Sequence, residues 1–264
     1  MNTEQFYQKL DQYYQSKQFQ EAEQFMLLSL KEAGEQRDLE GIVATCNELG
    51  GLYRATHRTE EALWAYDKVQ DCLTQLGMEH SINCAAALIN LGSVYTVRKE
   101  FRTAYEIYKK AEAILNQTDE NEYQLAALYN NMSACLRETG QERESISLVE
   151  KAIRKIERIP GHEIDLATSY VNMGQALIRA DRLKEARKSL ENALTVFQEA
   201  HAEGDSHYAI GIYALAGLNE RERDYHAARE GYAKAAALTE KSFGKSKDYE
   251  QILSDLERVE RYLS

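Results

Sequence analysis

The sequence has almost no proline, and this shortage excludes frequent breaks in its helices. Its 264 residues contain one proline and fourteen glycines. Proline removes a backbone donor and clashes inside a helix, so its near absence leaves helices almost uninterrupted. A hydrophobic content of 44% and a charged content of 28% are enough for a sizeable core. The composition therefore predicts a folded chain that is neither disordered nor fibrous.

Long apolar runs and excess positive charge are also missing. No stretch approaches the roughly 20 apolar residues that a membrane span needs, and the polar start, MNTEQFYQKL, does not resemble a secretory signal. The net charge is −11, without a lysine or arginine run, and such a surface repels nucleic-acid phosphate and anionic membrane. We expect a cytoplasmic protein with neither nucleic acid nor membrane as its partner.

Reactive and metal-binding patterns are absent as well. The cysteines Cys46, Cys72, Cys84 and Cys135 are widely spaced and form no C-x-x-C pair, so they are interpreted as small buried hydrophobic residues. A reducing compartment disfavours their pairing. The sequence also lacks H-E-x-x-H, a glycine-rich phosphate loop and G-x-S-x-G. These absences predict no enzyme activity, no metal and no cofactor.

What is present is a repeat with a period of 41 or 42 residues. A small residue follows an apolar one at each copy, and Leu10 marks a weaker first copy. The small residues are Gly50, Gly92, Ser133, Gly174 and Ala216. A fixed period of this size predicts a solenoid.

Further positions recur with the same period. Twelve residues after the small residue stand Ala62, Ala104, Ser145, Ala186 and Ala228. Sixteen residues after it stand Tyr66, Tyr108, Val149, Leu190 and Tyr232. A small residue lets two helices approach closely, and a large residue a turn away fills the space beside the contact. The pattern predicts pairs of packed helices, each pair one repeat.

This pattern resembles the tetratricopeptide repeat family over nearly the whole chain. The usual period of that family is about 34 residues, and the longer period here resembles the long-helix subclass of kinesin light chains. The resemblance implies an all-α solenoid of about six helical hairpins, with repeats near 3–35, 38–78, 80–118, 121–159, 162–203 and 205–244. The one-sided apolar helix expected at 246–263 is interpreted as a cap over the open end of the array at 1–245, and a dimerisation helix is the alternative.

Local signals place some of the ends of these helices. Asp38 and Asp119 are predicted N-caps, the second with Glu122 as a capping box. Gly140 and Gly244 are predicted turn or C-cap residues.

The resemblance also implies a binding groove, since the first helix of each hairpin lines the concave face in that family. Position by position, the predicted groove residues are Asn47, Arg54, Ile89, Asn90, Ser93, Asn130, Asn131, Arg137, Val171, Asn172, Gln175, Arg179 and Tyr213. The lysine–asparagine clamp of chaperone adaptors in the family is not present as such. We expect the partner to be another protein or a peptide.

Asn90, Asn131 and Asn172 share one position in three successive repeats. Asparagine is a mediocre helix former, and its amide both donates and accepts, so a ladder of such residues is suited to the backbone of an extended peptide. The alternative is an asparagine that faces solvent or bonds between helices, inherited by repeat duplication. Apolar contacts with the peptide are expected from Ile89, Val171, Ile210 and Tyr213.

Charge gives a second indication in the predicted groove. Four arginines, Arg54, Arg137, Arg179 and Arg221, stand there against three glutamates, Glu48, Glu138 and Glu220. A groove less negative than its surroundings steers a peptide with acidic residues, although helix-end arginines favoured by the helix dipole are an alternative explanation. The leading hypothesis is a scaffold or adaptor that binds an extended peptide. The alternatives are a self-associating structural module and a peptide sensor that acts on a separate protein.

Overall fold

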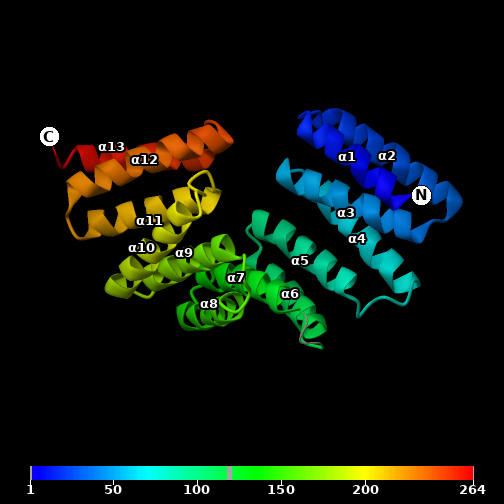
Figure 1. The fold of residues 1–264 in the computed structure, drawn as a ribbon, viewed down its shortest axis with the longest axis horizontal. Coiled ribbons are helices and arrows are strands. Elements are labelled where there is room, and N and C mark those ends of the chain that lie inside the picture. The colour runs from blue at the N-terminus through cyan, green and yellow to red at the C-terminus, as the bar shows by residue number, and fades with distance from the viewer. Residues whose placement is uncertain (1, 118–120, 264) are drawn as a thin grey trace. The chain divides into compact units, whose positions relative to one another are not determined.

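A computed structural model describes residues 2–117 and 121–263 of the chain. Within these residues the backbone forms thirteen α-helices and no strand (Figure 1). The helices are α1 Thr3–Gln15, α2 Phe19–Gln36, α3 Leu39–Ala55, α4 Thr59–Gln75, α5 Ile82–Val97, α6 Phe101–Leu115, α7 Glu122–Glu138, α8 Glu142–Ile156, α9 Glu163–Arg179, α10 Leu183–Glu199, α11 Ser206–Arg221, α12 Tyr225–Phe243 and α13 Lys247–Glu260.

The helices pack as sequential hairpins in two compact units. The first unit is 1–119, with α1 to α6, and the second is 120–264, with α7 to α13. Each odd-numbered helix from α1 to α11 packs on the helix that follows it, and within each unit the second helix of one hairpin packs on the first helix of the next. The all-α solenoid predicted from the repeat is confirmed. No helix in the described ranges is both long and apolar enough to cross a membrane.

The close contact inside each hairpin is the one that the spacing predicts. A Cβ built on Gly92 of α5 would stand 2.4 Å from Tyr108 Cε1 of α6, so only hydrogen fits there. The same close contact joins Gly50 to Tyr66 and Gly174 to Leu190. Glycine in a helix interior is unfavourable by roughly 1 kcal/mol relative to alanine. In these hairpins that cost is offset by the packing of a large side chain against the bare backbone.

Three hairpins lack this glycine, and the two that have another small residue in its place, α7–α8 and α11–α12, compensate in different ways. In α11–α12 the small residue is Ala216, and Gly231 of α12 takes the glycine role, since a Cβ there would lie 2.8 Å from Ala216 Cβ. In α7–α8 the small residue is Ser133, and its Oγ lies 2.8 Å from Ser145 Oγ, which also donates to the Ser133 carbonyl at 3.0 Å. The two helices of each hairpin thus stay close, in one case through a glycine on the second helix and in the other through hydrogen bonds between two serines.

The turn inside each hairpin has a left-handed residue seven positions after the small residue. These residues are Lys17, His57, Lys99, Gly140, Asp181 and Arg223. In α5–α6 the turn is closed by the Glu100 amide, which donates to the Tyr95 carbonyl at 2.9 Å, a six-to-one bond typical of helix C-termini. A non-glycine residue pays roughly 1–2 kcal/mol for this conformation. Only Gly140 avoids that strain.

The predicted caps are confirmed where the structure describes them. Asp38 accepts a hydrogen bond from the Gly41 amide at 2.9 Å and caps α3. Gly140 and Gly244 have positive φ values at the ends of α7 and α12. Asp119, the other predicted N-cap, lies outside the described residues, and Asn121 occupies the N-cap of α7.

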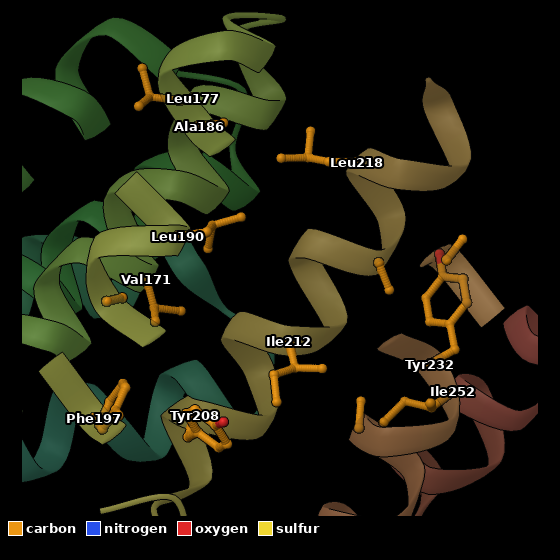
Figure 2. Close-up of a cluster of buried hydrophobic side chains, with 14 of the residues drawn as sticks. Val171, Leu177, Ala186, Leu190, Phe197, Tyr208, Ile212, Leu218, Tyr232 and Ile252 are labelled. Atoms are coloured by element: carbon orange, nitrogen blue, oxygen red, sulfur yellow. The ribbon is translucent and has the colours of Figure 1, made fainter. Parts of the chain in front are cut away.

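Helix α13 packs its apolar stripe onto α12 rather than exposing it. Ile252 and Val259 are buried and belong to one hydrophobic cluster with residues of α9 to α12. Figure 2 shows Ile252 of this cluster close to Tyr232. Arg258 stands 42 residues after Ala216, where the earlier first helices carry a small residue. Arg258 bonds there to Glu220 of α11. The role of 246–263 as a cap stays a prediction, and this packing supports it.

Candidate functional site

The first helices of the second unit form a continuous surface. α7 packs on α9 and α9 on α11, and we call the surface that these three helices share the first-helix face. It has two adjoining cavities, of about 420 and 560 Å³, and Gln175 and Tyr213 line both. The smaller cavity also has the apolar side chains of Ile210 and Ile252 on its walls. Predicted groove residues of α7, α9 and α11 therefore meet at one site.

The larger cavity is a positively charged pocket. Its charged residues are Arg137 and Glu138 from α7, Arg179 from α9 and Arg221 from α11, and we call it the arginine pocket. The three arginines leave an excess of two positive charges over the one glutamate. This excess contrasts with the net charge of −11 on the whole chain.

Arg137 is the most buried of the three arginines. Only 15% of its side chain is exposed, and its Nε lies 3.5 Å from Glu138 Oε1. Its Nη1 is buried without a hydrogen-bond partner. Burial lowers the pKa of Arg137, while the neighbouring Glu138 raises it. Arginine remains charged in proteins, so the pocket contains a desolvated guanidinium with an unused donor.

Arg137 stands four residues after Ser133, the small residue of α7. In other hairpins, the residue at this position pairs with a residue of the second helix that stands sixteen after the small residue. In α5–α6 the hydroxyls of Thr96 and Tyr108 lie 3.3 Å apart, and in α11–α12 Tyr232 donates to Glu220 at 2.8 Å. A tyrosine hydroxyl thus serves the polar residue at this position in both hairpins.

Arg54 of α3 also has a tyrosine, Tyr66, at the partner position on the second helix, whereas Arg137 does not. Burial raises the pKa of Tyr66 to about 12, and the charge and hydrogen bond of Arg54 oppose the rise. In α7–α8 the corresponding residue is Val149, which has no hydroxyl. Arg137 therefore stands at a position where the second helix of its hairpin supplies no hydroxyl, and its side-chain partner is Glu138 of its own helix. The sequence contains this mismatch, but it is visible only once the two positions are known to pair.

Four predicted site residues have buried atoms without partners. Among the described residues, the buried side-chain atoms that lack a hydrogen-bond partner are Asn47 Oδ1, Arg54 Nε, Gln70 Nε2, Asn130 Oδ1 and Arg137 Nη1. All but Gln70 were predicted as groove residues. None belongs to Asn90, Asn131 or Asn172, the three residues of the predicted ladder. The unsatisfied polar groups are thus found mainly one residue before the ladder position and at the arginine position.

The asparagines occupy two different environments. Asn130 Nδ2 donates to Ser169 Oγ at 2.8 Å, which ties α7 to α9. Asn131 and Asn172 are partly exposed on α7 and α9, and Asn90 is partly exposed on α5 in the first unit. Asn47 lines a separate cavity of about 390 Å³ in the first unit.

Two predicted groove residues serve the interior instead. Val171 is fully buried in the core of the second unit, and its Cγ2 would lie 3.3 Å from a Cβ on Gly211, so the expectation that it contacts a ligand is wrong. Ser93 donates to the Ile89 carbonyl at 2.9 Å and lies 3.2 Å from the Tyr108 hydroxyl. Ile89 itself is partly exposed on α5.

A polar network behind the site was not predicted from the sequence. Tyr213 donates to Asp255 Oδ2 at 2.6 Å, and Arg258 donates from Nε and Nη2 to the two oxygens of Glu220 at 2.8 and 2.7 Å. Arg258 also bonds to Asp255, which is 4% exposed. Burial raises the pKa of Tyr213, and its hydrogen bond to Asp255 adds to the rise. The network fixes the Tyr213 ring at the boundary of the two cavities.

Comparisons with known proteins bear on this architecture. The sequence profile of the tetratricopeptide repeat matches residues 42–117, 124–199 and 165–241. Protein KINESIN LIGHT CHAIN-RELATED 2 of Arabidopsis thaliana is 27% identical over 211 residues, which are 77% of this chain and 31% of that protein. Protein KINESIN LIGHT CHAIN-RELATED 1 of the same plant is 22% identical over 154 residues, 58% of this chain and 25% of that protein. The chain thus spans only about a quarter to a third of these relatives.

Solved structures agree with the fold. The apo form of RapI has a TM-score of 0.69 at 15% identity and covers 100% of this chain and 72% of its own. NprR in complex with its cognate peptide NprX has a TM-score of 0.67 at 17% identity and covers 97% of this chain and 78% of its own. BtubC (BKLC) from P. vanneervenii has a TM-score of 0.62 at 18% identity and covers 77% of this chain and 83% of its own. The predicted resemblance to kinesin light chain repeats is confirmed.

Proposed function

The chain belongs to the tetratricopeptide repeat family, and we propose that it is a non-enzymatic scaffold that holds an extended segment of a partner protein on the first-helix face. The observation that carries the proposal is Arg137. Its buried Nη1 has no partner, and Val149 of the second helix has no hydroxyl to supply one. A buried donor left unpaired costs about 1–3 kcal/mol, and a turn of the guanidinium toward an acceptor of a peptide in the pocket removes that cost.

The geometry of the site supports an extended ligand. Two cavities adjoin along α7, α9 and α11, and one is apolar where the other is positively charged. An extended peptide presents successive side chains to different places, so it can use both cavities at once. NprR, which has the same fold, is described in complex with a peptide. At 17% identity this neighbour supports the fold of a peptide binder but not the identity of the peptide.

The asparagine ladder is our proposal for how the peptide backbone is held. Asn131 and Asn172 lie on α7 and α9, on the helices that line the arginine pocket, and their side chains remain partly exposed. An amide that donates and accepts can pair with a peptide unit of any sequence. Asn90 would play the same part in the first unit.

Self-association through α13 is the weaker alternative. Its apolar residues Ile252 and Val259 are buried within the chain, and Tyr249, Leu253 and Leu256 pack partly against the same core. A helix whose stripe is already covered has little apolar surface for a second copy. This observation favours the peptide scaffold over the dimerisation module.

The test combines peptide selection with alanine variants. Displayed random twelve-residue peptides would be selected on the full chain, and the affinity of selected peptides would be measured by calorimetry. Replacing Asn90, Asn131 and Asn172 with alanine is expected to weaken binding at least tenfold, about 1.4 kcal/mol, with an unchanged helical circular dichroism spectrum. Asn192→Ala, an exposed asparagine on α10, is the matched control. Unchanged affinity in the triple variant would refute the ladder, and failure to select any peptide would refute the scaffold.

A further inference from the structure

We propose that the arginine pocket is a subsite for the phosphorylated side chain of a peptide. The inference rests on the proposed function, since the peptide that carries the phosphate is the one held on the first-helix face. It adds the chemical class of the ligand, which the family does not specify.

Charge is the first step. Arg137, Arg179 and Arg221 converge on a cavity of about 560 Å³, and Glu138 is the one acidic residue in its lining. The lining therefore has an excess of two positive charges, and Asp181, which lies 3.9 Å from Arg221, is 87% exposed and outside the lining. A phosphorylated serine or threonine carries about −1.5 to −2 charges at pH 7, which matches this excess.

The second step is the state of Arg137. Its side chain is 15% exposed, so water reaches it poorly, and its Nη1 has no partner. The guanidinium is a planar fork that binds two oxygens of a phosphate or carboxylate at once. Glu138 lies 3.5 Å from the Nε of this fork, and an anion in the pocket meets the exposed 15% of the side chain, so Nη1 bonds to it after a turn of the guanidinium.

The third step is the freedom of the other two arginines. About half of each side chain is exposed, 51% for Arg179 and 52% for Arg221. Their contacts with acidic groups are long, since Arg179 lies 3.6 Å from Glu138 Oε2 and Arg221 lies 3.9 Å from Asp181 Oδ1. Exposed pairs of this kind contribute little to stability. Both guanidinium groups can therefore turn toward an anion without losing a strong interaction.

These observations favour phosphate over carboxylate as the occupant. Glu138 already places one carboxylate against Arg137 and Arg179, and the excess of positive charge persists. One more carboxylate would remove half of the excess. A phosphate supplies three acceptor oxygens, so each of the three arginines can bind one.

The experiment uses the full chain and three peptide libraries that are identical except for the central residue, which is phosphoserine, glutamate or serine. We expect the phosphoserine library to be retained at least tenfold better than either of the others. Arg137→Met should lower retention of the phosphoserine library at least tenfold and lower retention of the serine library by a smaller factor. Arg154→Ala, an exposed arginine on α8, is the charge-matched control and should change neither.

The outcomes separate this inference from the proposed function. Equal retention of the glutamate and phosphoserine libraries would overturn the phosphate assignment, and so would equal losses in Arg137→Met and Arg154→Ala. A third outcome is that the serine and phosphoserine libraries are retained equally and that the asparagine variants lower the retention of both. This outcome would overturn the inference and preserve the scaffold. Retention of no library would overturn both. Should Arg137→Met unfold, as thermal unfolding would show, the exposed pair Arg179→Ala and Arg221→Ala replaces it, with the same tenfold loss expected.

Discussion

The hairpins α5–α6 and α7–α8 pack their two helices in the same way, but the polar side chains of their first helices differ in whether they have hydrogen-bond partners. In α5–α6 the Tyr108 ring packs on Gly92, and its hydroxyl meets Ser93 and Thr96. In α7–α8 Val149 replaces that tyrosine, and Arg137 is left with an unused donor. Among the described residues, no buried side-chain N or O atom of the first hairpin lacks a partner, whereas two in the second do, Asn130 Oδ1 and Arg137 Nη1. We propose that the binding site lies where one member of a repeated pair has changed and the other has not.

The largest effect is expected where the packing plan itself is broken. Gly50→Ala places a methyl group 2.6 Å from Tyr66 Cζ, and overpacking of this kind costs about 1–3 kcal/mol. The neighbouring Gly51→Ala meets no atom within 4 Å and should stabilise the chain by roughly 1 kcal/mol through helix propensity. Urea unfolding of the two variants measures both. Shifts of the same sign would contradict the packing account.

Giving α7–α8 the core residues of α5–α6 tests directly whether the missing tyrosine frees Arg137. Ser133→Gly, Ser145→Ala and Val149→Tyr together copy the small, small and large residues of α5–α6, and the new hydroxyl is expected to bind Arg137. We expect at least a tenfold loss of affinity for a selected phosphopeptide, about 1.4 kcal/mol.

A matched control differs from this graft only at position 149. Val149→Leu, with the same two serine changes, copies Gly174, Ala186 and Leu190 of α9–α10, which supply no hydroxyl. Calorimetry should show near-native affinity for this leucine graft. Equal affinities of the tyrosine and leucine grafts would show that the partner of Arg137 does not matter.

A smaller effect is expected from exchanging the turn residues of the two hairpins. Lys99 has a φ of 60° and Gly140 a φ of 76° at equivalent places. Lys99→Gly should stabilise the first unit by about 1 kcal/mol, because the strain of a left-handed lysine exceeds the entropy that glycine adds to the unfolded chain. Gly140→Lys should destabilise the second unit by a similar amount. Thermal unfolding followed by circular dichroism gives the sign of each change.

The smallest expected effect is a pH dependence of the stability of the second unit. The hydrogen bond from Arg258 lowers the pKa of Glu220, and Tyr232 lowers it further. The stabilisation is complete above the ordinary glutamate pKa of about 4.3 and is lost as pH falls through the lowered folded-state pKa. Exchange protection of α13 should fall below a pH of about 4, and Glu220→Gln should flatten this dependence. A pH dependence that survives in Glu220→Gln would contradict the assignment.

Helix positions and hairpin contacts could be predicted because every repeat meets the same neighbours. Gly92 and Tyr108 recur as a pair, so the spacing alone indicates their contact. Asp38 and Gly140 carry their own local signals. The left-handed conformation of Lys99 has no such signal, because it is imposed by the turn and not by the residue.

The candidate site was harder to predict because its residues depend on the neighbouring helix. Asn130 and Val171 stand at the same repeat position, yet one bonds to Ser169 and the other packs by Gly211 in the core. The Tyr213–Asp255 bond could not be predicted, because helical spacing identifies the apolar stripe of α13 but not the partners of its polar side chains. The arginine pocket can be predicted only when the repeat positions of Arg137 and Val149 are known to pair across the hairpin.

The most direct test of the peptide scaffold is site-specific photocrosslinking in the full chain. p-Benzoylphenylalanine would replace Ile210, which is partly exposed and lines the smaller cavity, and in a second protein it would replace Lys188, which is exposed on α10. With a peptide selected on the wild-type chain, we predict crosslinking from position 210 and none from position 188. Crosslinking from position 188 alone, or equal crosslinking from both, would contradict binding on the first-helix face.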